Sequence, residues 1–144
     1  MKDLSIYIHI PFCKEKCYYC DFLSFKGKES YFDAYQKALL KEIIDFANNN
    51  KNIYEVKTIF IGGGTPSALP LGFIGEIMET IFKNFNVSKL AEITTEANPG
   101  ALSYELIKHF KDSGINRISL GVQSLENSLL KDIGRIHTAE QFYE

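Results

Sequence analysis

The chain has 144 residues, of which 45% are hydrophobic and 24% are charged, and its formal net charge at pH 7 is −2. This composition is that of an ordinary globular domain, and a net charge so near zero provides no basic surface for nucleic acid. No apolar run approaches the roughly 18 residues that a membrane-spanning helix needs, and residues 1–12 lack the features of a secretory signal. The sequence therefore favours a cytoplasmic protein without a transmembrane segment.

The first half of the chain predicts two strands and two helices. An alternating, β-rich run predicts a strand over residues 4–10, which Pro11 ends. Residues 11–28 are predicted to form a loop, and Ser30 is the predicted N-cap of a helix over about 31–48. A second strand over residues 56–61 runs into the turn Gly62-Gly63-Gly64-Thr65-Pro66, and a helix over about 70–84 follows.

The second half continues the same alternation. A third strand over residues 91–97 is closed by Asn98-Pro99-Gly100, and Ser103 caps a predicted helix over about 104–112. A fourth strand over residues 117–121 and a short helix over 125–133 follow, and Thr138 is the predicted cap of a fifth helix. This order predicts an α/β protein with parallel strands and about four βα units. Because four units do not close a barrel, we interpret the chain as the N-terminal part of a longer protein.

The polar features of the sequence follow the predicted strands. The cysteine loop, the glycine-rich turn, Glu96 with the Asn98-Pro99-Gly100 turn, and Gln123 each come directly after a strand. In parallel α/β folds the chemistry lies at the carboxyl ends of the strands. These four features are therefore expected to meet at one rim of the sheet.

All three cysteines of the chain lie within residues 13–20, with the spacing Cys13-x3-Cys17-x2-Cys20. An odd number of cysteines so close together is a poor disulfide framework. Thiolates on a loop can hold an iron–sulfur cluster, and three of them leave one iron of a [4Fe–4S] cluster open, as a catalytic site requires. Two alternatives remain at this point, namely inert buried cysteines and a zinc site with His9 as the fourth ligand.

Several stretches of the sequence resemble the radical S-adenosylmethionine (SAM) family that contains oxygen-independent coproporphyrinogen III oxidase and its relatives. The resemblance runs from Tyr7 to the end of the chain. The matching stretches are Tyr7-Ile8-His9-Ile10-Pro11-Phe12-Cys13, Cys17-Tyr18-Tyr19-Cys20-Asp21-Phe22, Gly62-Gly63-Gly64-Thr65-Pro66-Ser67, Glu96-Ala97-Asn98-Pro99-Gly100, Arg117-Ile118-Ser119-Leu120-Gly121-Val122-Gln123-Ser124 and Gly134-Arg135-Ile136-His137.

The resemblance implies a fold and a set of cofactors. The fold is a partial parallel (βα) barrel, of which residues 1–144 would be the N-terminal part of the core domain. The cofactors are a [4Fe–4S] cluster held by Cys13, Cys17 and Cys20, and SAM bound to the open iron. An electron donor such as flavodoxin or ferredoxin would reduce the cluster. No residue is assigned a catalytic role of its own, because the cofactors perform the chemistry.

The resemblance also implies which residues contact SAM. Gly63, Gly64 and Thr65 would hold its methionine part, since glycines without a Cβ let the backbone approach a ligand. Tyr7 and Glu96 would lie beside it, Gln123 would bind the ribose hydroxyls, and Arg135 would pair with the carboxylate. Taken alone, the glycines could form a plain tight turn, Glu96 could be a solvated acid, Gln123 a loop residue and Arg135 a cation at a helix end.

The residues after Cys20 bear on the branch of the family. The coproporphyrinogen oxidases have a glycine and a further cysteine there, whereas Asp21-Phe22 resembles the heme chaperones. We therefore interpret the chain as part of a heme chaperone that binds heme, and leave open whether it is an enzyme. The alternatives are the oxidase itself, which converts coproporphyrinogen III into protoporphyrinogen IX, and a non-catalytic zinc-binding module.

Overall fold

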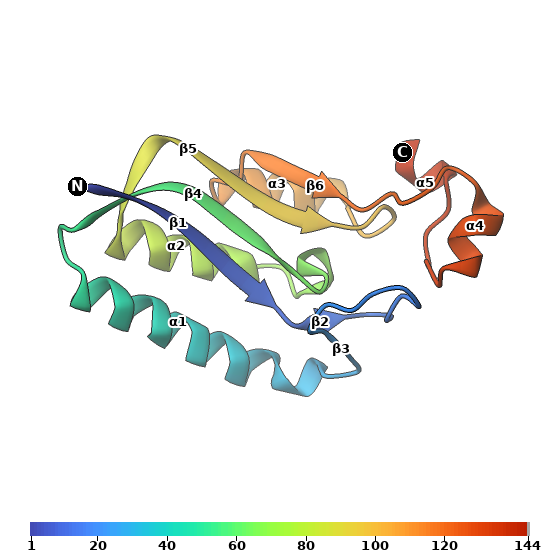
Figure 1. The fold of residues 1–144 in the computed structure, drawn as a ribbon, viewed down its shortest axis with the longest axis horizontal. Coiled ribbons are helices and arrows are strands. Elements are labelled where there is room, and N and C mark those ends of the chain that lie inside the picture. The colour runs from blue at the N-terminus through green and yellow to red at the C-terminus, as the bar shows by residue number, and fades with distance from the viewer. Residues whose placement is uncertain (144) are drawn as a thin grey trace.

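The computed structural model describes residues 1–143, and its centre is a four-stranded sheet with the order β1-β4-β5-β6 (Figure 1). All neighbouring strands of this sheet are parallel, so the predicted α/β class is confirmed. The strands of this sheet are β1 (Lys2–Ile10), β4 (Tyr54–Gly63), β5 (Asn86–Ala97) and β6 (Arg117–Leu120). The helices are α1 (Phe32–Asn49), α2 (Phe73–Asn84), α3 (Tyr104–Asp112), α4 (Asn127–Asp132) and α5 (Glu140–Tyr143).

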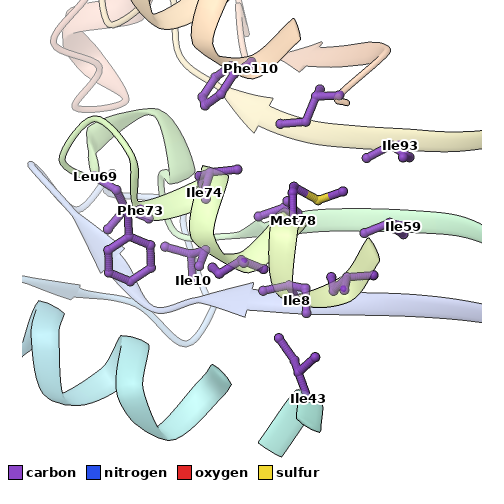
Figure 2. Packing of buried hydrophobic residues seen from close by; sticks show 14 of the residues in the cluster. Ile8, Ile10, Ile43, Ile59, Leu69, Phe73, Ile74, Met78, Ile93 and Phe110 are labelled. Carbon is purple, nitrogen blue, oxygen red and sulfur yellow. The ribbon is translucent and has the colours of Figure 1, made fainter. Parts of the chain in front are cut away.

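The helices that connect the strands cover one face of the sheet and build the core there (Figure 1). The apolar residues of α2 that recur at the helical period, Ile74, Ile77, Met78 and Ile81, are at most 2% exposed. They pack against buried isoleucines of β1 and β4 and against Phe110 of α3 (Figure 2). Burial of side chains of this size contributes about 1.5–3 kcal/mol each, so α2 holds the sheet together. Phe82, near the end of α2, is 44% exposed.

The other face of the sheet carries a row of aromatic and polar side chains in register. Tyr7 of β1 pairs with Phe60 of β4, Phe60 with Thr94 of β5, and Thr94 with Arg117 of β6. Because paired residues of a parallel sheet point to the same side, these four side chains share the face that lacks α1 and α2. Tyr7 and Phe60 stack with their ring centroids 6.1 Å apart.

Two of the three predicted helix caps are present. The Ser103 hydroxyl accepts a hydrogen bond from the Leu106 amide at 3.1 Å, as an N-cap should. Thr138 and Gln141 bond each other's backbone amides reciprocally, which is a capping box for α5. Ser30 is not a cap, because residues Glu29–Tyr31 form a 3₁₀ turn and α1 begins only at Phe32 without a side-chain cap.

Two segments are more ordered than the sequence predicts. The expected loop over residues 11–28 contains two short parallel strands, β2 (Phe12–Cys13) and β3 (Phe25–Lys26), which close its base. Strand β5 begins at Asn86 rather than near residue 91, because its polar start pairs with β4 at Glu55 and Val56. Within residues 1–143, no helix has the length and apolar character to cross a bilayer.

Candidate functional site

The carboxyl ends of the four strands meet at one rim, as expected. The chain leaving β4 is bound to the chain leaving β1, since the Gly64 amide donates to the Ile10 carbonyl and the Thr65 amide donates to the Phe12 carbonyl, both at 2.7 Å. The Gly121 amide at the end of β6 donates to the Ala97 carbonyl of β5 at 2.9 Å. These backbone bonds fix the cysteine loop, the glycine turn and the ends of β5 and β6 in one arrangement.

Neighbouring groups of the protein leave no room for side chains in the glycine turn. A Cβ on Gly64 would lie 2.5 Å from the Phe12 carbonyl oxygen and 2.8 Å from that of Ile10. Gly63 has φ +110°, and a Cβ there would lie 2.6 Å from the His9 ring. A Cβ on Gly62 would lie 2.7 Å from Glu96 Oε2, so its absence leaves room for the Gly63 amide to donate to that oxygen at 3.0 Å. The turn thus brings β1, β4 and the end of β5 together.

The three cysteines are free thiols, each partly exposed, and two of them have polar neighbours from other elements. The Thr65 hydroxyl lies 3.5 Å from the Cys13 sulfur, and Nη1 of Arg135 lies 3.5 Å from the Cys17 sulfur. The Cys20 amide donates to the Cys17 carbonyl at 3.1 Å, which bends the chain between these two cysteines. Cys13 and Cys17 therefore each face a donor group from another part of the rim.

The thiols surround a common volume and do not converge on a common point. Within residues 1–143, no three His, Cys, Asp or Glu side chains stand close enough to hold one metal ion. A cubane cluster takes its thiolates on separate iron corners, so a shared volume suits it. The zinc alternative also loses its fourth ligand, because His9 Nε2 donates to the Leu23 carbonyl at 2.7 Å and Nδ1 accepts from Tyr7 at 2.9 Å.

That volume is a cavity of about 440 Å³, within the range of small-molecule sites. It brings together nine of the ten residues that the sequence predicted for the cluster and for SAM. They are Cys13, Cys17, Cys20, Gly63, Gly64, Thr65, Glu96, Gln123 and Arg135. Gln123 adopts φ +67°, a left-handed conformation that a non-glycine residue holds only where its surroundings impose it.

Tyr7 is the predicted residue that does not line this cavity. It shares its strand face with His9, as the alternation predicted, but its hydroxyl is used in the bond to His9. Burial and the negative charge of Glu96 both raise the pKa of Tyr7 above its usual value. The phenol therefore stays protonated and can remain the donor of that bond.

Arg135 contacts three parts of the rim. Its Nη2 donates to Asn98 Oδ1 at 2.7 Å and to the Gly121 carbonyl at 2.6 Å, while Nη1 reaches Cys17. Asn98 also donates to the Thr65 hydroxyl at 3.4 Å. The Arg135 Nε–H is buried and has no hydrogen-bond partner among residues 1–143. A guanidinium has five donors, so Arg135 keeps a donor for an anionic ligand while it holds the rim.

Asn98 and Lys16 also line the cavity but were not predicted as binding residues. Asn98 was assigned only to a turn, although a polar amide at a strand end was a signal for the site. Lys16 lies between two of the cysteines, and a lone lysine in a polar loop gives no signal of its own.

His137 beside the rim is expected to make stability depend on pH. It is buried, and Nε2 donates to the Val122 carbonyl at 3.1 Å. Its Nδ1 is also buried and has no partner in the part of the chain that the structure describes. Burial first, and then the charge of Arg135, lower the pKa of His137 from its usual 6.5. As pH falls through about 6.5, the unfolded chain therefore takes up the proton before the folded protein does, and the free energy of unfolding falls.

We expect the thermal midpoint to drop between about pH 7 and pH 5, and His137→Gln to weaken this dependence. Thermal unfolding followed at several pH values checks the expectation. Equal pH slopes for the two proteins would contradict it.

Comparison with known proteins identifies the family to which the chain belongs. The model of the radical SAM superfamily matches residues 7–144. The chain belongs to the radical SAM superfamily. Membership of this superfamily implies a [4Fe–4S] cluster and SAM as cofactors. The donor set fits them, because three thiols, a carboxylate and an arginine line one cavity.

Similar proteins include curated heme chaperones. The chain is 46% identical over 143 residues to the heme chaperone HemW of Lactococcus lactis, covering 99% of this chain and 36% of that protein. It is 42% identical over 146 residues to HemW of Escherichia coli, covering 98% of this chain and 37% of that protein. The chain thus spans about a third of the length of these relatives, and the predicted resemblance to the heme chaperone branch is confirmed.

A solved radical SAM structure shares the fold. Coproporphyrinogen III oxidase (HemN) from Escherichia coli superimposes with a TM-score of 0.91 at 31% identity, covering 99% of this chain and 33% of that chain. This likeness confirms the predicted partial parallel (βα) barrel of the radical SAM type.

Proposed function

We propose that Cys13, Cys17 and Cys20 hold a [4Fe–4S] cluster and that SAM binds beside it in the same cavity. The observation that carries this proposal is the cavity itself, which joins the three thiols to the glycine turn, Glu96, Gln123 and Arg135. Three protein thiolates leave one iron open for a further ligand. When bound, the reduced cluster and SAM would supply a 5′-deoxyadenosyl radical, which is the cofactors' chemistry.

The roles of the protein side chains follow from their positions. Gly63 and Gly64 would leave the backbone accessible to the methionine part of SAM, beside Thr65. Glu96 is already held by the Gly63 amide, so its second oxygen would accept from the ligand's ammonium group. The unpartnered Nε–H of Arg135 would donate to the ligand's carboxylate. Gln123 would bind the ribose hydroxyls, and Tyr7 would remain close to the site through His9.

For the whole protein we propose a heme chaperone of which residues 1–144 are the N-terminal part of the radical SAM core domain. Curated HemW relatives at 41–46% identity support this choice, as does Asp21-Phe22 after Cys20. Its partners would be SAM, heme and an electron donor such as flavodoxin or ferredoxin, in the cytoplasm, and we expect no nucleic acid. The alternative is coproporphyrinogen III oxidase, which the likeness to HemN favours.

An anaerobic experiment on the full-length protein separates these functions. After reconstitution with iron and sulfide, we expect about four irons per chain, retention of added heme through gel filtration, and no conversion of coproporphyrinogen III. Robust formation of protoporphyrinogen IX would replace the chaperone by the oxidase. One zinc per chain without sulfide would overturn both.

A further inference from the structure

The ammonium group of Lys16 binds the opposite half of the cysteine loop. Lys16 lies between Cys13 and Cys17, and its Nζ donates to the Phe22 carbonyl at 2.6 Å. It also donates to the Ser24 hydroxyl at 3.1 Å and reaches the Ser24 carbonyl at 3.4 Å. An ammonium has three donors, so all of them have acceptors in one short segment that follows Cys20.

These bonds complete the closure of the loop. Its base is closed by the β2–β3 pairing and by the Phe25 amide, which donates to the Pro11 carbonyl at 2.8 Å. Further along the loop, two side-chain contacts join the chain before Cys17 to the chain after Cys20. They are the bonds of Lys16 to Phe22 and Ser24, and an ion pair between the exposed side chains of Glu15 and Lys26 at 2.6 Å. Ser24 is buried, with 7% of its surface exposed, so its hydroxyl and carbonyl offer fixed acceptors.

The opposite side of the loop is held independently. The Tyr18 amide donates to the Ile133 carbonyl at 3.1 Å, and the Tyr18 ring covers Gly134, where a Cβ would lie 3.1 Å from it. The Cys17–Cys20 segment is therefore fixed on the α4 side by its backbone. The limb that carries Phe22 and Ser24 is held by Lys16 and by His9, whose Nε2 donates to the Leu23 carbonyl at 2.7 Å. Of these two side chains, Lys16 is the one that connects this limb to the chain between Cys13 and Cys17.

We infer that Lys16 is a positioning residue that holds the three cysteines around the cavity in the arrangement that the cluster needs. The inference rests on the proposed cluster site. Hydrogen bonds to a charged group are stronger than those between neutral groups, and they help to order a loop in which Phe22 and Leu23 are mostly exposed. Lys16 also lines the cavity, so its charge lies on the same side as the anionic thiolates and partly offsets their mutual repulsion.

The test compares Lys16→Met with Lys14→Met in the full-length protein. Lys14 lies in the same interval between Cys13 and Cys17, is exposed, and makes no hydrogen bond within residues 1–143. In the apo protein, Lys16→Met should accelerate amide exchange over residues 20–25, whereas Lys14→Met should not. In the reconstituted protein, Lys16→Met should lose iron to a chelator about tenfold faster, as expected for a lost supporting interaction.

Lys16→Arg gives a further check, because it keeps the charge and several donors, and should restore much of the wild-type rate of iron loss. Equal behaviour of Lys16→Met and Lys14→Met in a protein that holds its cluster would overturn the inference alone. Failure of the unsubstituted protein to assemble any cluster would overturn the proposed function, and the role of Lys16 with it.

Discussion

Replacement of any one of Cys13, Cys17 and Cys20 by alanine should reduce the cluster content of the full-length protein from about four irons per chain to near zero. A cubane that already has one iron without a protein ligand would then have two, and the remaining pair of thiolates cannot prevent its loss. Iron and sulfide analysis after anaerobic reconstitution measures the effect, and the visible absorption of the cluster should disappear in parallel.

The control for this experiment is Lys14→Ala, which changes the same loop at an exposed side chain. It should retain the full iron and sulfide content. The three thiols line the cavity from one loop, so each of the three alanine variants should lose the cluster. The additional contacts of Cys13 with Thr65 and of Cys17 with Arg135 should not change this result. Full iron and sulfide in any one of them would remove that cysteine from the proposed ligand set.

Local sequence patterns predicted most of the fold because the connecting helices α1 and α2 and the strand β1 turn one side toward the core. The stripe of α2 from Ile74 to Ile81 is buried as its period indicates. The patterns failed where pairing overrides local preference. The start of β5 at Asn86 is polar, and only its neighbour β4 makes it a strand. Likewise, nothing in residues 29–31 distinguishes a 3₁₀ turn from the first turn of α1.

The site was predictable to the extent that strand ends define it. Parallel strands bring their carboxyl ends to one rim, so features spread from Cys13 to Gln123 could be expected together. The sequence could not give the hydrogen bonds within the rim. Arg135 contacts Cys17, Asn98 and Gly121 from the segment after α4, and that contact depends on how the chain returns over the sheet.

The same bonds show that binding residues also hold the rim in shape. Arg135 bonds the ends of β5 and β6 with one nitrogen and lies beside a cysteine with another. Glu96 takes the Gly63 amide with one oxygen. Because each such side chain still has an unused donor or acceptor, a ligand can be bound without breaking the rim. Preorganisation of this kind lowers the cost of ordering the site at binding.

We expect a single added methyl group to destabilise the protein most at Gly64. In Gly64→Ala, the new Cβ would lie 2.5 Å from one backbone oxygen and 2.8 Å from another, and backbone cannot rotate away as a side chain can. The chain after β4 would have to move, which weakens the bonds from the Gly64 and Thr65 amides to the chain after β1. We expect destabilisation of about 3 kcal/mol, a lower thermal midpoint of the apo protein, and little cluster after reconstitution.

Substitutions of two other glycines distinguish the steric clash expected at Gly64 from the other effects of replacing a glycine. Gly27→Ala places a methyl group in open space at a residue with φ +68°, so it should cost only the left-handed backbone penalty of about 1 kcal/mol and leave cluster content intact. Gly62→Ala would meet the side chains of Glu96 and Phe60 at 2.7 Å, which can move, so it should disturb Glu96 more than the fold. A Gly64→Ala protein as stable as Gly27→Ala would show that the close approach of the two strand ends does not hold the rim. The shape of the cavity would then have to come from other contacts.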